Sequence, residues 1–134
     1  MARATVTKEL YAEAKSETGL LGRITLALKE QDVYIVHLSA YSAGDTGYLQ
    51  MITKDNQKAK RILAQFIPKT EERDVLLVEF ENKVGTLAEV AKLLGSNNIS
   101  INYVYGTSGD GFKIVGIFST QDNERAAKII NEET

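Results

Sequence analysis

The chain has 134 residues, 43% of them hydrophobic and 25% charged, values that suit one ordinary domain or two very small ones. It has no cysteine and one histidine, so disulfides, thiolate metal sites and centres with several histidine ligands are excluded. The formal net charge of −2 makes a nucleic-acid partner unexpected. There is no apolar signal core at the amino terminus and no run of about 18 apolar residues, so we expect a cytoplasmic protein without membrane contact.

The first half of the chain is predicted to run strand, helix, strand, strand, helix. Apolar residues at helical spacing follow Gly19, and runs rich in β-branched and aromatic residues indicate the strands. A Ser-Ala-Gly-Asp turn at residues 42–45 joins two strands into a hairpin. We expect strands at residues 4–14, 31–38 and 47–53, and helices that begin near Leu20 and near Asn56.

The second half repeats this pattern. The segment Glu17-Thr18-Gly19-Leu20-Leu21 recurs as Lys83-Val84-Gly85-Thr86-Leu87, and its amphipathic helix starts with a possible capping box of Thr86 and Glu89. We expect strands at residues 74–81, 97–104 and 112–118, a turn at 108–111, and a last helix that begins near Asn123. A polar link runs from Pro68 to Arg73, so the predicted domains are residues 1–73 and 74–134.

These elements predict an α+β fold of two tandem ferredoxin-like βαββαβ units side by side. The sequence stops at Thr134, soon after the last helix, so the second unit is expected to lack a full last strand. That gap should expose a sheet edge beside the apolar strand at residues 75–80, and exposed edges invite pairing with another chain. We therefore expect a homodimer, with a monomer closed by its own connector, residues 67–74, as the alternative.

The segment from Val78 to Leu94, followed by Asn97-Asn98-Ile99-Ser100-Ile101, closely resembles the ACT domain family. The resemblance covers essentially the whole chain as two tandem copies, and it is stronger over residues 75–120 than over residues 5–53. In both copies the proline that usually precedes the loop glycine is replaced, by Thr18 and by Val84. The resemblance implies a small, non-catalytic regulatory module that binds an amino acid, with ligand sites between neighbouring modules.

The two strand–helix loops are the candidate ligand sites. A glycine there lets a ligand approach the backbone, and the unpaired helix amides beyond it suit a carboxylate. The alternative is a glycine that only permits a tight turn, which we favour for the first copy because its loop departs more from the family pattern. The residues expected to bind ligand are Asn82, Lys83, Val84, Gly85, Thr86 and Leu87, with Asn98 and Ile99 across from them, and Thr18, Gly19 and Leu20 in the first copy.

No residues lie in a recognisable catalytic context, and no cofactor or metal is expected, so we do not expect an enzyme. Residues 110–117 partly resemble an RNA-binding strand, but Asp110 and the later aliphatic residues lack the chemistry that stacks bases. The leading hypothesis is a non-catalytic sensor that binds a small molecule, an amino acid. The alternative is a structural or oligomerising accessory subunit, without a ligand of its own, that regulates a separate amino-acid biosynthetic enzyme.

Overall fold

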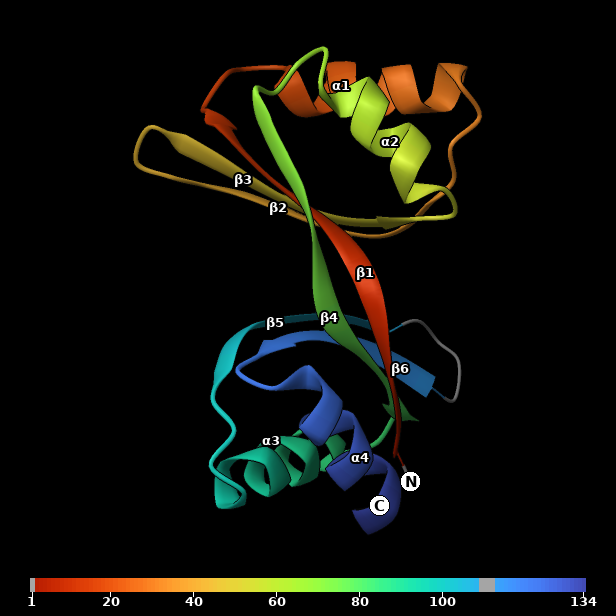
Figure 1. Ribbon diagram of the computed structural model, residues 1–134, viewed down its shortest axis with the longest axis vertical. Helices are drawn as coiled ribbons and strands as arrows, with labels where there is room; N and C mark the ends of the chain where they lie inside the picture. The colour runs from red at the N-terminus through yellow and green to blue at the C-terminus, as the bar shows by residue number, and fades with distance from the viewer. Residues whose placement is uncertain (1, 109–112) are drawn as a thin grey trace. The chain divides into compact units, whose positions relative to one another are not determined.

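The computed structural model describes residues 2–108 and 113–134 and divides into two units (Figure 1). The first unit is Lys8–Arg73, and the second unit combines residues 2–7 with Asp74–Thr134. Of the helices in these residues, none is long and apolar enough to cross a membrane. The elements are, in chain order, β1 (Ala2–Lys15), α1 (Leu20–Glu30), β2 (Ile35–Ala43), β3 (Thr46–Thr53), α2 (Asn56–Leu63), β4 (Lys69–Glu81), α3 (Thr86–Ser96), β5 (Ile101–Ser108), β6 (Lys113–Thr120) and α4 (Asn123–Glu133).

This order confirms the predicted α+β fold of two ferredoxin-like units. The turn predicted at residues 42–45 connects β2 to β3, and Gly44 takes the left-handed backbone conformation that such a turn requires, with φ of 62°. The turn predicted at residues 108–111 falls mostly outside the described residues. The polar link after Pro68 is not a separate connector, because it continues without a break into the apolar run as the single strand β4.

Two long strands contribute to both units. β1 passes from the second unit to the first between Thr7 and Lys8, and β4 passes back between Arg73 and Asp74. The units of the structure are thus residues 8–73 and residues 2–7 with 74–134, and the predicted domains of residues 1–73 and 74–134 stay a prediction. The sharing of strands was not predicted because pairing between distant strands leaves no local signal in the sequence.

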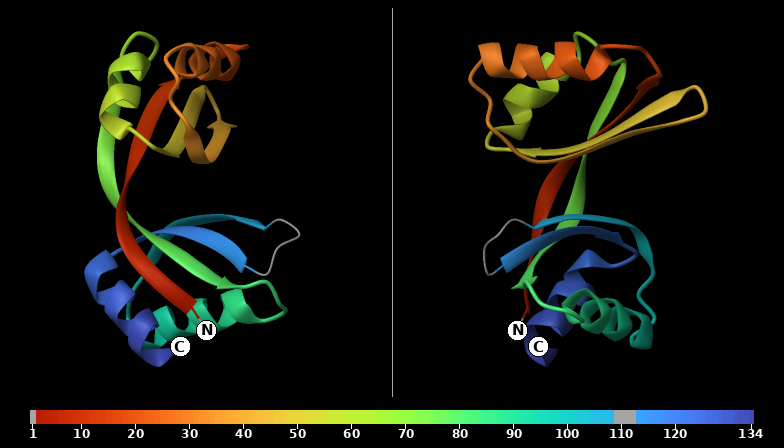
Figure 2. Two further views of the ribbon diagram at one scale, coloured as in Figure 1. Left: turned by 90° about the vertical axis from the view of Figure 1, so that its right-hand side faces the viewer. Right: turned by 180° about the vertical axis from the view of Figure 1, so that it is seen from behind.

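The first unit has the strand order β2-β3-β1-β4. β1 runs antiparallel to β3, with Leu10 opposite Met51 and Ala14 opposite Gly47. Figure 2 shows α1 and α2 on the same face of these strands. The apolar residues buried there form the core of the unit: Leu10, Ala12, Ile24, Leu28, Val33, Leu49, Met51, Ala59, Ile62, Leu63 and Ile67.

The second unit has the strand order β5-β6-β4-β1, so residues 2–7 occupy the place of the last strand. The expectation that this strand is missing was wrong. The amino-terminal segment supplies it, and the apolar half of β4 lies between β1 and β6 rather than at an exposed edge. The buried core of the unit takes in both ends of the chain: Ala2, Ala4, Leu76, Val78, Phe80, Val90, Leu94, Ile99, Phe118, Ala126 and Ile130.

Side chains near the end of the chain hold this amino-terminal segment in place. The Asn131 side chain accepts a hydrogen bond from the Ala4 amide at 2.7 Å and donates one to the Ala4 carbonyl at 2.9 Å. The Thr134 hydroxyl accepts from the Ala2 amide at 3.0 Å and lies 2.9 Å from the Ala2 carbonyl oxygen. Backbone groups that would otherwise be free to pair with another strand are thus already bonded within the unit.

The second helix of each half starts from the same set of hydrogen bonds. The Asn56 side chain accepts bonds from the Thr53 amide and hydroxyl, at 3.0 and 2.8 Å, and donates to the Lys8 carbonyl at 3.1 Å. Asp55 caps α2 by accepting from the Lys58 amide at 3.1 Å. Residues 120–123 repeat these contacts at α4, with the carbonyl of Asp74 in place of that of Lys8. The caps are therefore the aspartates, and the asparagines that follow them tie each helix to a strand.

Candidate functional site

The two helices that follow the candidate loops begin with a glycine rather than with a side-chain cap. Gly19 and Gly85 occupy the N-cap positions of α1 and α3 with φ of 84° and 96°, in the left-handed region that other residues avoid. No capping bond from a described side chain reaches either helix start. The predicted capping box does not form, because Thr86 is already helical and its hydroxyl donates to the Lys83 carbonyl at 3.2 Å. Both helix starts thus keep a partial positive charge without a side-chain acceptor.

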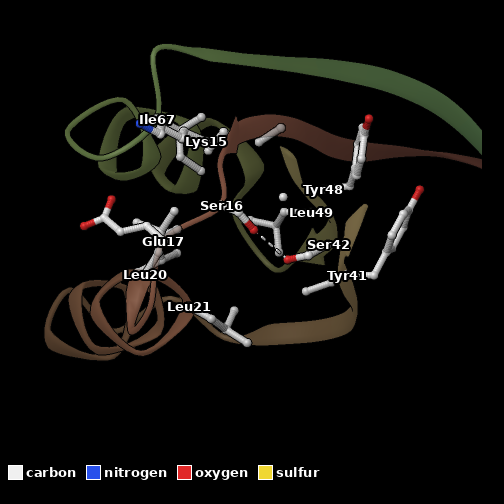
Figure 3. A pocket seen from close by; sticks show the side chains of 15 residues that line it. Lys15, Ser16, Glu17, Leu20, Leu21, Tyr41, Ser42, Tyr48, Leu49 and Ile67 are labelled. Carbon is white, nitrogen blue, oxygen red and sulfur yellow. Dashed lines mark hydrogen bonds between the residues drawn. The ribbon is translucent and has the colours of Figure 1, made fainter. Parts of the chain in front are cut away.

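A cavity of about 230 Å³ lies beside the first of these loops, within the first unit (Figure 3). Its walls come from the β1–α1 loop, the first two turns of α1 and the ends of β1, β2 and β3 that meet there. Most of its surface is apolar. It is lined by Ala12, Ala14, Lys15, Ser16, Glu17, Leu20, Leu21, Ile24, Ala40, Tyr41, Ser42, Gly47, Tyr48, Leu49 and Ile67.

The rim of this cavity is polar. The hydroxyl groups of Ser16 and Ser42 point toward each other at 2.9 Å (Figure 3), and the Ser16 amide donates to the Asp45 carbonyl at 2.7 Å. These two bonds join the strand–helix loop to the β2–β3 hairpin. Lys15 and Glu17 line the same rim, so it offers hydroxyl groups and charges of both signs.

The sheet forms the floor of the cavity, and it leaves space there because three small residues lie side by side in one row across the strands. Ala14 on β1 is opposite Gly47 on β3, and Gly47 is opposite Ser42 on β2. Residues directly opposite one another in antiparallel strands share a face, and here that face is the one covered by α1. In the next row of opposite residues, Leu49 lies between Ala12 and Ala40, so both of its neighbours there also have small side chains. Room for a ligand therefore follows from strand register as much as from the loop.

The second unit fills the corresponding row with larger side chains. Phe80 and Ile114 are opposite each other at the positions that Ala14 and Gly47 hold in the first unit. The Phe80 side chain is buried, and its ring lies over Gly116, where an added Cβ would come within 3.4 Å of it and within 2.9 Å of the Phe118 ring. A hollow of about 260 Å³ remains, lined by Phe80, Leu87, Val104, Tyr105, Gly106, Ile114, Val115 and Gly116. No residue from 81 to 86 lines it, so among the described residues the strand–helix loop contributes no polar wall.

The predicted site residues are only partly brought together. Leu20 lines the first cavity and Leu87 lines the second hollow, whereas Val84 is fully exposed and Thr86 is buried under its own loop. Lys83 pairs with Glu81 at 3.2 Å on an exposed surface. The sequence analysis did not predict the residues that form the floor and rim of the first cavity. The one local signal for them was the alternation of alanine along β1, at Ala12 and Ala14.

Asn98 and Ile99 do not lie across from the loop of the second copy. They follow α3, whereas Gly85 precedes it, and a helix of 11 residues separates the two ends by about 16 Å. Asn98 ends the helix in the left-handed conformation, with φ of 58°, as Asp32 does after α1. Ile99 is buried in the core. These two residues terminate a helix, and they form no common site with residues 82–87 inside the second unit.

The helix-free face of the first unit carries a small charged cluster. The Arg73 guanidinium lies 3.6 Å from the centre of the Tyr11 ring, and the Tyr11 hydroxyl donates to Glu13 at 2.7 Å. Burial and that hydrogen bond raise the pKa of Tyr11 to about 12. The hydrogen bonds from Arg73 lower the pKa of Glu71. The cluster connects the first residues of β4 to β1 and lies on the opposite face of the sheet from the cavity.

Solved structures with this architecture include regulatory subunits of aspartate kinase. A protein of Bacteroides thetaiotaomicron is 22% identical with a TM-score of 0.86, and the match covers 97% of this chain and 90% of that chain. The ligand-free regulatory subunit of aspartate kinase from Thermus thermophilus is 13% identical with a TM-score of 0.71, covering 96% and 95%. The corresponding subunit from Thermus flavus is 14% identical with a TM-score of 0.66, covering 98% and 95%. At these identities the likeness shows a shared fold.

The sequence itself gives the assignment to a family. Among proteins of curated function, none matches the chain. Residues 5–134, which span both units, match the family described as the ACT domain pair. This match agrees with the internal repeat around Gly19 and Gly85 and with the ferredoxin-like strand order of each unit. The chain therefore belongs to the ACT domain pair family of regulatory modules.

Proposed function

We propose that the chain is a non-catalytic regulatory module that binds a free amino acid at a strand–helix loop and passes this signal to a partner protein. The observation that carries the proposal is the cavity of the first unit, which opens beside an uncapped helix start. A pocket with an apolar interior and a few polar groups at its rim is the usual form of a small-molecule site. The similar structures named as regulatory subunits of aspartate kinase support a regulatory role.

The polar groups around the loop suit the two charged ends of an amino acid. A carboxylate placed at the start of α1 meets the positive end of the helix and first-turn amides that no side chain caps. An ammonium group needs acceptors, which the hydroxyls of Ser16 and Ser42 and the loop carbonyls supply, together with the Glu17 carboxylate, which also pairs with Arg23. The loop from Asn82 to Leu87, with Gly85 at its helix start, has the same uncapped first-turn amides and is the alternative place for the carboxylate.

A thermal-shift screen of the twenty amino acids against the full chain tests this function. A ligand at 100 times its dissociation constant stabilises the folded state by about 2.7 kcal/mol, which is readily seen as a higher melting temperature. No shift with any amino acid at millimolar concentration would contradict the proposal. Gly19→Val and Gly85→Val, each checked for its own melting temperature, then report which loop the ligand needs, because a Cβ strains both positions.

A second candidate is an accessory subunit without a ligand, which oligomerises and regulates a separate enzyme. β2 lies at the edge of the first unit's strand order, and it carries large hydrophobic side chains that are exposed by 37–53%, namely Val36, Leu38 and Tyr41. Exposed apolar edges favour pairing with another chain. We therefore keep the homodimer as a proposal, now on β2 rather than on a missing strand. Light scattering after gel filtration tests it, and a mass near 15 kDa at tens of micromolar would contradict it.

A further inference from the structure

The geometry points to a single ligand site per chain, in the first unit, that selects an amino acid with an apolar side chain. This inference rests on the proposed function, because it names which loop binds and what the ligand carries. The side chain of the ligand would lie on the row formed by Ala14, Gly47 and Ser42, which is the part of the sheet nearest the loop. Its charged ends would remain at the polar rim, by Ser16 and Glu17.

The second unit shows what fits on this row. There, the chain places the ring of its own Phe80 and the side chain of Ile114 on the positions of Ala14 and Gly47. Phe80 is only 4% exposed, so the ring is packed under the unit's helices rather than turned outward. The same fold therefore accepts an apolar group at this place. In the first unit the side chains at these two positions are only the methyl group of Ala14 and the hydrogen of Gly47. The space that they leave can take a group from outside the chain.

The size and chemistry of the cavity narrow the class of ligand. Its volume of about 230 Å³ exceeds the ~150 Å³ that accommodates benzene in an engineered apolar cavity. A branched aliphatic or a phenyl side chain therefore fits. Leu21 and Ile24 of α1 and Leu49 of β3 form apolar walls around the row, and the charged lining residues, Lys15 and Glu17, lie at the rim. A ligand with a charged side chain would bury that charge against these apolar walls without a partner, which is costly.

The second unit does not offer an equivalent site. Phe80 and Ile114 occupy the row beside its loop, and the hollow that remains is lined by strand residues and Leu87. Residues 82–86 do not line that hollow, so within the described part of the unit an amino acid there would meet no polar groups of the strand–helix loop. One molecule per chain is the stoichiometry that follows from this difference.

Isothermal titration calorimetry of the full chain tests the inference. Leucine, isoleucine, valine, methionine and phenylalanine are compared with lysine, aspartate, serine and threonine. The Ala14→Phe variant places the phenyl ring of the second unit on the first row, and we expect it to bind at least tenfold more weakly with only a small change in melting temperature. Ile114→Val, which changes only the second unit's hollow, is the matched control and should bind as the parent does.

A milder variant covers the case in which Ala14→Phe does not fold. A Cβ at Gly47 would meet only the Ala14 carbonyl oxygen at 3.7 Å, an ordinary contact, so Gly47→Ala narrows the row without strain and should weaken binding several-fold.

Binding of an apolar amino acid at one molecule per chain, weakened by these variants, supports the inference. Two molecules per chain, binding of charged or polar amino acids alone, or parent-like affinity in Ala14→Phe would each overturn it and leave the proposed function standing. Binding of no amino acid at all would overturn the proposed function itself.

Discussion

The two units share the contacts that build the fold and differ in the row of the sheet that lies next to the strand–helix loop. Residues 53–56 and residues 120–123 make the same hydrogen bonds at the start of α2 and α4, with distances that agree within about 0.1 Å. Beside the loops, by contrast, Ala14 and Gly47 in one unit correspond to Phe80 and Ile114 in the other. Because the backbone register is the same, the difference lies in side-chain size alone. A repeat can thus keep its architecture and still line the hollow beside its loop differently, with small residues in one copy and with Phe80 and Ile114 in the other.

The largest expected effect comes from removing the strand that only the second unit borrows. Deleting residues 1–7 takes away the last strand of that unit and leaves Asn131 and Thr134 without their backbone partners. At about 1 kcal/mol for each hydrogen bond, plus lost burial of Ala2 and Ala4, we expect the second unit to lose on the order of 4 kcal/mol. Hydrogen exchange should accelerate in residues 74–81 and in α4, and much less in α2.

The Asn131→Ala variant is the matched control for this deletion. It removes two of the bonds to Ala4 and keeps the strand, so it should cost only about 1–3 kcal/mol. If the deletion left exchange in residues 74–81 unchanged, the amino-terminal segment would not be part of the second unit's fold.

A second prediction compares the stability changes caused by substitutions at Phe80 and at Ala14, which hold the same position in the two units. Phe80→Ala removes a buried ring and should destabilise the second unit by about 3–5 kcal/mol in urea unfolding followed by circular dichroism. Ala14→Phe adds a ring where space exists and should change stability by less than about 1.5 kcal/mol. Equal losses for the two variants would mean that the first row is already closed in solution.

The sequence predicted the order of the elements well because each is a local pattern. The repeat around Gly19 and Gly85, the helical spacing after it and the turn at residues 42–45 all concern neighbouring residues, and all are found in the structure. The last strand of the second unit could not be predicted in this way. It places residues 2–7 beside β4, which begins only at Lys69, and the hydrogen bonds of Asn131 to Ala4 join positions 127 apart.

The candidate site was predicted less well for a related reason. The loop glycines were identified correctly as helix starts, but the cavity depends on Ala14, Gly47 and Ser42, which come from three different strands. Which residues share a row is set by strand register, and the sequence does not reveal register between strands that a helix separates. The better family resemblance of the second loop drew attention to the copy in which Phe80 takes the space.

A smaller, symmetric effect is expected at the capped helices. Asp55→Ala and Asp122→Ala each remove the acceptor for one first-turn amide, a loss of about 0.5–2 kcal/mol. Because the surrounding contacts repeat, the two losses should agree within about 0.5 kcal/mol when each unit is followed by hydrogen exchange. A clear difference between them would show that the two helix starts, although alike in geometry, do not contribute equally to the stability of their units.

The smallest expected effect is a pH dependence of stability that only the first unit should show, because it has His37 where the second unit has Tyr103. His37 follows an irregularity in the pairing of β2, at the place where Tyr103 follows the same irregularity in β5. Partial burial lowers the pKa of His37 below its ordinary value of 6.5, so the unfolded chain binds more protons than the folded one just below pH 6.5. Stability from this group is therefore complete above pH 6.5 and is lost as the pH falls through the lowered pKa. Hydrogen exchange in β2 should accelerate slightly between pH 7.5 and 5.5, after correction for the intrinsic rate, relative to residues 101–106. His37→Gln should abolish this difference, and a difference that survived the substitution would assign it to another group.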